Sequence, residues 1–240
     1  MAERNTLKRI IAYLAVALII PAMIVTFAVY LPKKAFMPVA VGIAFVAVAA
    51  FMLCFERGAD NAAKAVLAAV FTALSVAGRV LFAATPGFKP VFAMTIFAGA
   101  YLGGETGFMV GAFSALLSNF FFGQGGWTIF QMFTWGLIGL VAGLLGPILR
   151  KHTAILCTVG FFAGPMFSLV IDVWSTVWIF GKFSWSSYLV TAMNALPFTI
   201  MYAVSNVFFL LILARPMRRT MNRITVKYGL LHQKRRLDRR

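Results

Sequence analysis

The sequence predicts an all-α integral membrane protein with about eight membrane-spanning helices. Of its 240 residues, 62% are hydrophobic and only 12% are charged, and the mean hydropathy of +0.91 lies far above that of soluble globular domains. A run of 44 residues from Thr106 to Leu149 contains no Asp, Glu, Lys or Arg. Because every backbone polar group must be satisfied inside hydrocarbon, helices of about 20 apolar residues are the expected element.

Eight apolar stretches are candidates for spans, and they lie at 10–30, 36–55, 62–83, 90–103, 106–122, 128–148, 154–179 and 187–213. The first follows MAERNTLKR and holds 21 uncharged residues. That length exceeds the core of an ordinary signal peptide, so we expect a retained span. The fourth is short and ends in Gly103-Gly104. The long uncharged run is divided into a hairpin by GQGGW at 123–127, whose glycines favour a turn.

The distribution of basic residues predicts the orientation. Eight spans place both termini on one side, and that side holds 17 of the 22 Lys and Arg residues, ten of them after Ala214. The opposite side holds five, namely Lys33, Lys34, Arg79, Lys89 and Lys182. A basic excess marks the cytoplasmic side of a span. We therefore expect a multi-pass protein of the cell membrane, with both termini in the cytoplasm and the GQGGW turn outside.

Residues 215–240 form a basic tail on a chain whose formal net charge is +16. Directly after a span, the expected partner is an anionic lipid surface rather than nucleic acid, and each basic residue near such a surface contributes about 1 kcal/mol. A solvated tail that only sets the topology explains the same pattern. The spacing of Cys54, Cys157, His152 and His232 suggests neither a disulfide nor a metal site, and we expect no cofactor.

A stripe of alanines follows one face of the stretch at 62–83, where the residues at intervals of four are Ala65, Ala69, Ala73 and Ala77. This spacing stacks them into a ridge with little side chain. Small residues in lipid allow close backbone approach, so the ridge is either internal packing or a docking surface for another protein. Two glycine series, from Gly99 to Gly111 and from Gly136 to Gly146, are assigned to packing within the bundle.

Polar side chains gather around the GQGGW turn. Trp127, Gln131 and Trp135 recur at intervals of four and share one helix face, Asn119 lies one turn before the break, and Gln124 lies within it. Unpaired polar groups in hydrocarbon cost several kcal/mol, so these must pair with each other or bind something polar. One interpretation is an interhelical amide pair with tryptophans at the membrane interface. The other is the wall of a ligand pocket.

Two further polar residues are assigned to the same pocket. Asp172 is the only acid well inside an expected span, and Ser168 and Thr176 lie four residues on either side of it. Asn194 begins a stripe in the last span that continues through Phe198, Tyr202 and Asn206. An apolar, aromatic pocket with a few oriented polar groups is typical of small-molecule sites. No Walker A sequence, metalloprotease motif or nucleophile elbow occurs, so we expect no catalytic residue and no metal site.

The stretch from about Ala62 to Gly146 resembles the substrate-binding (S) components of energy-coupling factor (ECF) vitamin transporters. The resemblance rests on the alanine ridge in AVLAAVFTALSVAGR and on SNFFFGQGGWT followed by QM and WGLIG. It implies a six-helix core at 61–214, to which residues 1–60 add two N-terminal membrane helices and residues 215–240 a basic cytoplasmic tail. It also implies that the outward loops at 84–89, 123–127 and 180–187 cap a bound vitamin.

The resemblance further implies a non-enzymatic subunit of an ABC-type importer. The alanine ridge would dock a transmembrane coupling subunit that carries two cytoplasmic ATPases, and the ligand would be a vitamin or related micronutrient, with cobalamin or a precursor as candidates. The pocket residues would be Asn119, Gln124, Trp127, Gln131, Trp135, Asp172 and Asn194. The alternative is a self-sufficient secondary transporter with Asp172 at a coupling-ion site, although such carriers are expected to show inverted repeats.

Overall fold

The computed structural model describes residues 61–228, together with seven isolated positions between 26 and 42. The expected spans at 10–30 and 36–55 fall almost wholly outside the described residues. Within 61–228 the chain is helical and contains no strand. Its helices are α3 (Asn61–Leu81), α4 (Val91–Leu102), α5 (Gly104–Phe122), α6 (Gly126–Leu144), α7 (Gly146–Leu149), α8 (Thr153–Phe180) and α9 (Trp185–Tyr228).

The expectation of about eight spans is corrected by helix length and hydropathy. Among the described residues, four helices are long and apolar enough to cross a membrane: α3, α6, α8 and α9. With 12 residues, α4 is about 18 Å long, well short of the roughly 30 Å of hydrocarbon. Although α5 has 19 residues, Glu105, several glycines and Asn119 lower its hydropathy. The all-helical membrane fold is confirmed, whereas a count of eight full spans is not.

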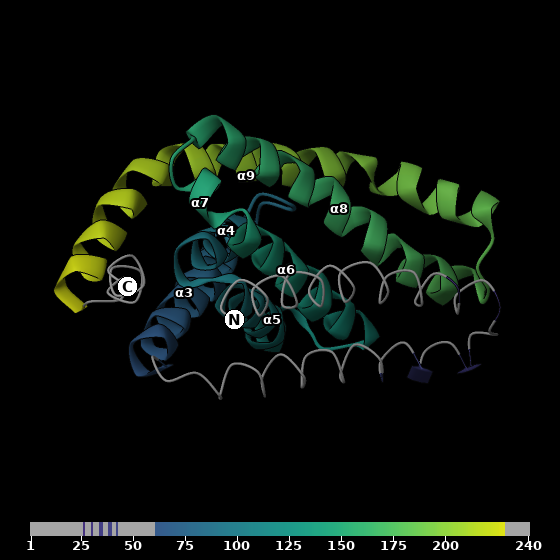
Figure 1. Cartoon of the computed structure of the whole chain (residues 1–240). Helices are drawn as coiled ribbons and strands as arrows, with labels where there is room; N and C mark the ends of the chain where they lie inside the picture. Colours follow the sequence, from purple (N-terminus) through teal and green to yellow (C-terminus); the bar gives the residue numbers. More distant parts are fainter. Residues whose placement is uncertain are drawn as a thin grey trace, which may run out of the picture.

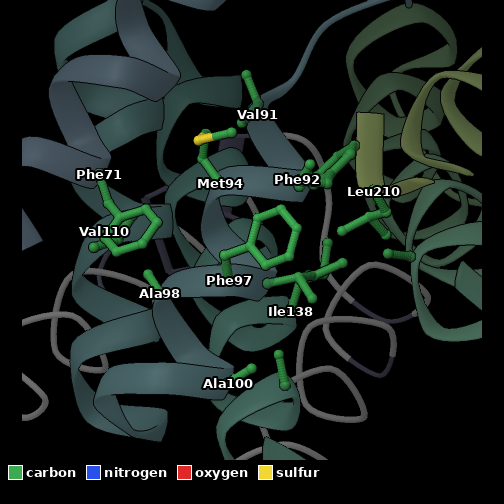
Figure 2. Packing of buried hydrophobic residues seen from close by; sticks show 14 of the residues in the cluster. Phe71, Val91, Phe92, Met94, Phe97, Ala98, Ala100, Val110, Ile138 and Leu210 are labelled. Atoms are coloured by element: carbon green, nitrogen blue, oxygen red, sulfur yellow. The ribbon is translucent and has the colours of Figure 1, made fainter. Parts of the chain in front are cut away.

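The short helix α4 forms the centre of the core. Eleven of its 12 residues are buried, which explains why its sequence is apolar on every face. Figure 2 shows Phe92, Phe97 and Ala98 of α4 among side chains from its neighbours, including Ile138 of α6 and Leu210 of α9. A segment buried on all sides is as hydrophobic as a membrane span, so its hydropathy alone placed the short stretch at 90–103 among the candidate spans.

Glycines set the spacing of α4, α5 and α6. A Cβ atom added to Gly99 would lie 2.1 Å from the carbonyl oxygen of Gly139, and one added to Gly139 would lie 2.1 Å from that of Gly107. Any side chain at these positions would collide with backbone, so the three helices pack at the closest distance that a bundle allows. The assignment of the glycines to internal packing is confirmed except at Gly103, where an added Cβ would meet no atom within 4 Å.

The helices α8 and α9 form a long antiparallel pair that runs along one side of the bundle (Figure 1). With 44 residues, α9 is about 66 Å long and continues well past the expected end of its span at 213. Figure 1 shows its last part, in yellow, turning away from the rest of the helix. Pro216 lies inside α9, and a proline within a helix bends it because it removes a backbone hydrogen bond and clashes with the preceding turn.

After the bend, the first part of the basic tail is an amphipathic helix. Met221 is 2% exposed, and it lines a hollow of about 260 Å³ together with Met217, Ile224 and residues of α3. Arg219 and Arg223 are exposed on the other side. The apolar residues at 217, 221 and 224 follow the helical repeat, which explains why this segment stays helical and packs on α3.

Candidate functional site

A buried arginine organises the polar cluster. Arg79 lies in the last turn of α3, where a cation complements the negative end of the helix dipole, and only 9% of its surface is exposed. Its Nη1 donates to Asn119 Oδ1 over 2.7 Å and to Ser118 Oγ, both on α5. The guanidinium also lies over two aromatic rings, 4.4 Å from the centroid of Phe122 and 5.1 Å from that of Trp135. Arg79 therefore connects α3 to α5 and α6.

Three amide side chains continue from Arg79 as one hydrogen-bonded chain. Asn119 Nδ2 donates to Gln131 Oε1 over 2.8 Å and to Thr128 Oγ1 over 3.0 Å. Thr128 Oγ1 donates in turn to Gln124 Oε1 over 2.9 Å, and Gln124 Nε2 donates to the Leu116 carbonyl. The interhelical amide pair considered for this region is thus present, and it joins Asn119 of α5 to Gln131 of α6.

The direction of every bond in this chain is fixed by Arg79. A guanidinium only donates, so Asn119 must turn its carbonyl oxygen toward it and its NH₂ group toward α6. Gln131 must then present its own oxygen to that NH₂ group. The oxygens of Asn119, Gln131 and Gln124 are consequently all occupied by donors from the protein.

An aromatic wall adjoins the amide chain. Trp135 of α6 is 4% exposed, and its ring centroid lies 5.7 Å from that of Phe92 and 6.0 Å from that of Phe167. Tyr202 of α9 completes the group, with its ring centroid 5.3 Å from that of Phe167. Trp135 Nε1 is buried without a hydrogen-bond partner among the described residues. The site thus combines large aromatic faces with unpaired donors.

The second polar group of the site lies on α8 and α9. Asp172 is 4% exposed, and its carboxylate accepts a hydrogen bond of 3.5 Å from Ser168 Oγ, which lies 2.5 Å from Thr199 Oγ1 of α9. Thr176 donates to the backbone carbonyl of Asp172 rather than to its carboxylate. Asp172 lies on α8, the helix that also carries Phe167 of the aromatic wall.

Two expected pocket residues take other positions. Trp127 of α6 packs edge-to-face on Trp174 of α8, and the two ring centroids are 5.6 Å apart. This contact joins the two helices. Asn194 is exposed on α9 and joins no hydrogen bond with the described residues. Each step of four residues turns a helix by about 40°, so a stripe of four such residues spans about 120° and its ends face different directions. Thr191, one turn earlier, is the buried polar residue, and it accepts from Thr176 over 3.1 Å.

Lys89 is the second cation of the site. It lies in the connection between α3 and α4, where its backbone N and O both bond Ser205 Oγ of α9. Its Nζ is 4.9 Å from the centroid of the Phe122 ring that Arg79 also contacts. Sequence reasoning used Arg79 and Lys89 only to count charges. The available signal was an arginine in the last turn of an apolar helix, where a charge needs a partner.

The alanine ridge lies on a separate face of α3. Ala65, Ala69, Ala73 and Ala77 are all exposed. They line an apolar groove of about 700 Å³ whose other side is formed by α5, with Phe113, Leu117 and Phe121. The ridge is therefore not used for packing between the helices that the structure describes.

Comparison with protein families identifies the chain. The family described as the ECF-type riboflavin transporter, S component, matches residues 58–223, which is more than half of the 240 residues. No curated protein and no solved structure matches the chain. The matched region contains the alanine ridge, the amide chain and the aromatic wall. S components are transporter subunits for vitamin uptake and not enzymes, and this apolar, helical membrane protein belongs to the family of ECF-type riboflavin transporter S components.

Proposed function

We propose that this chain binds a vitamin at the site formed by Arg79, the amide chain and the aromatic wall, and delivers it across the cell membrane. The observation that carries the proposal is the family match over residues 58–223, which includes both this site and the exposed ridge. The site has the composition of a small-molecule pocket, with aromatic faces and a few oriented polar groups. The orientation expected from the basic residues puts its amide turn on the extracellular side.

The first candidate substrate is riboflavin or a related flavin, because the family description names riboflavin. A planar ring system suits the faces of Trp135, Phe92, Phe167 and Tyr202, which lie within 6.3 Å of one another as neighbouring pairs. Asp172 would accept a hydrogen bond from the opposite end of the ligand. Cobalamin or a precursor, suggested by the sequence resemblance, is the second candidate.

Delivery depends on a separate coupling module. The ridge residues Ala65, Ala69, Ala73 and Ala77 are exposed and apolar, and the groove beside them accepts a helix that approaches closely. The sequence contains no Walker A motif. The partner is therefore a transmembrane coupling subunit that is bound to two cytoplasmic ATPases, and the ATP is hydrolysed outside this chain.

The test is uptake of labelled riboflavin, with labelled cobalamin in parallel, by proteoliposomes that contain this chain with or without a coupling subunit and ATPases. We expect uptake only with the complete set of subunits and ATP. Uptake by this chain alone would overturn the proposed dependence on a module.

The alternative is a self-sufficient secondary carrier, and the buried Asp172 is the observation that favours it. A carrier would accumulate substrate in response to a proton or sodium gradient without ATPases, and Asp172→Asn would abolish that response. For a binding subunit, Asp172→Asn changes the affinity for substrate, while uptake through the complete set of subunits still requires ATP.

A further inference from the structure

Two positive charges meet in the site without a protein counter-ion. The guanidinium carbon of Arg79 and Lys89 Nζ lie 4.4 Å and 4.9 Å from the centroid of the same Phe122 ring. Among the residues that the structure describes, neither cation forms a salt bridge, and both hydrogen bonds of the guanidinium go to neutral oxygens. Asp172 accepts from Ser168 instead. A buried cation without a paired anion is costly, so its retention calls for a partner.

The two cations also disfavour each other. Lys89 lies in a connection outside the spanning helices, where burial, and to a smaller extent the positive charge of Arg79, hold its pKa below the usual value. An anion placed between the two side chains would relieve both effects, because an opposite charge stabilises the protonated amine and offsets the repulsion.

The uncharged part of the site presents donors as well. The carbonyl oxygens of Asn119 and Gln131 already accept hydrogen bonds from the protein. With the residues described, Arg79 donates from Nη1 alone, Gln131 Nε2 donates to no residue, and Trp135 Nε1 is buried without an acceptor. Arg79, Gln131 and Trp135 therefore keep N–H groups without an acceptor among the described residues, while the oxygens of Asn119 and Gln131 are used internally. Such a site favours a ligand that is rich in acceptors.

On the basis of the function proposed above, we propose that the substrate is an aromatic molecule carrying an anionic group, a phosphate monoester or a carboxylate, which binds between Arg79 and Lys89. Its ring lies on the aromatic wall, and an oxygen of the anionic end accepts from Trp135 Nε1. The free Nε and Nη2 of the guanidinium offer the two parallel donors that phosphate and carboxylate groups prefer.

Matched pairs of flavins test this inference on the full chain in nanodiscs of neutral lipid. Riboflavin is compared with riboflavin 5′-phosphate, and lumiflavin with 10-carboxymethylflavin, by isothermal titration calorimetry. We expect the anionic member of at least one pair to bind at least about tenfold more tightly than its neutral partner, because hydrogen bonds to charged groups are stronger than those between neutral groups. The pair with the larger difference identifies phosphate or carboxylate. Equal or tighter binding of both neutral members would overturn the inference and leave the proposed vitamin site intact.

Variants assign the effect to the two cations. Arg79→Gln should abolish the difference within a pair, and Lys89→Gln should reduce it without disturbing the bond between Arg79 and Asn119. Lys151→Gln removes an exposed charge in the segment before α8 and serves as the control. If Arg79→Gln does not fold, Lys89→Gln decides the question. An undiminished preference for the anionic flavin in Lys89→Gln would contradict the assignment.

Failure of the flavin assignment is distinguishable from failure of the anion site. If no flavin binds, the flavin substrate is wrong, and the same samples are titrated with phenyl phosphate and phenol. Binding of phenyl phosphate that exceeds that of phenol and is weakened by Lys89→Gln would support the anion site. Equal or absent binding of the two compounds would overturn it.

Discussion

Arg79 of α3 donates to Asn119 Oδ1 of α5 over 2.7 Å, and this bond fixes which way the Asn119 amide faces. The NH₂ group of the same amide then reaches Gln131 of α6 over 2.8 Å. One buried side chain, 1% exposed, thus ties three helices together at the point where the aromatic wall begins. The amides that appeared anomalous in an uncharged run are oriented by a charge from another helix.

Replacing Asn119 with leucine should lower the free energy of unfolding by about 1–3 kcal/mol, because Arg79 loses an acceptor in a buried setting. The measurement is thermal unfolding of the purified protein in detergent, together with titration of riboflavin. Asn222→Leu, an exposed amide on α9, is the matched control. A variant at 119 that unfolds and binds like the control would show that the bond has no energetic role.

Gly111→Ala should weaken ligand binding through the backbone. A Cβ at this position would lie 2.3 Å from the carbonyl oxygen of Trp135, so α5 and α6 must separate and Trp135 must move. We expect a lower melting temperature and a weaker affinity for riboflavin, both measured on the purified chain. An unchanged affinity would mean that the position of Trp135 does not matter for the ligand.

Ala69→Trp or Ala73→Trp should abolish uptake while riboflavin binding by the isolated chain survives. Both residues are exposed on the groove face of α3, where a large side chain blocks close approach of a partner helix. Val66→Trp is the control, since Val66 is 64% exposed and does not line the groove. Loss of binding as well as uptake would indicate that the ridge packs internally.

Arg219→Gln combined with Arg223→Gln should weaken retention of anionic lipid. Both side chains are exposed on the amphipathic end of α9, and each cation near an anionic surface contributes about 1 kcal/mol. Native mass spectrometry of protein exchanged into mixed neutral and anionic lipid measures the change. The control is Lys182→Gln, which the distribution of basic residues is expected to place on the opposite side of the membrane. If the double variant and the control retain the same amount of anionic lipid, the tail only sets the topology.

Binding of riboflavin 5′-phosphate should weaken as the pH rises into the range in which Lys89 loses its proton. Lys89 attracts the phosphate only while it is protonated, and its lowered pKa brings deprotonation below the usual lysine range near about 10.4. The groups around its side chain are the Arg79 guanidinium and the uncharged Phe122 ring. Lys89→Arg should flatten the profile. The same pH dependence in that variant would assign the titration to another group.

Local patterns predicted much of the fold. The glycine repeats identified the close packing of α4, α5 and α6, and GQGGW identified the turn between α5 and α6, where the structure leaves residues 123–125 between the helices. Hydropathy misjudged α4, because a fully buried helix and a membrane span have the same composition. It also ended the last span at 213, just before the basic tail begins, whereas α9 continues as a helix to Tyr228.

The grouping of the polar side chains was predicted in part. Asn119, Gln131 and Trp135 converge as expected from their spacing around the turn, because contacts between neighbouring helices follow from the helical repeat. The role of Arg79 depends on a contact across 40 residues of chain, which periodicity cannot supply. Asn194 is exposed although Asn206 is buried, because a stripe at intervals of four drifts around the helix.

Native mass spectrometry of the purified chain tests most directly whether the cluster around Arg79, Asn119 and Trp135 is a vitamin site. We predict one bound small molecule per chain, whose mass is that of a flavin or another vitamin. Asn119→Leu should lose this molecule, and Asn222→Leu should retain it. A chain that carries only lipid, with the same lipid in both variants, would contradict the assignment.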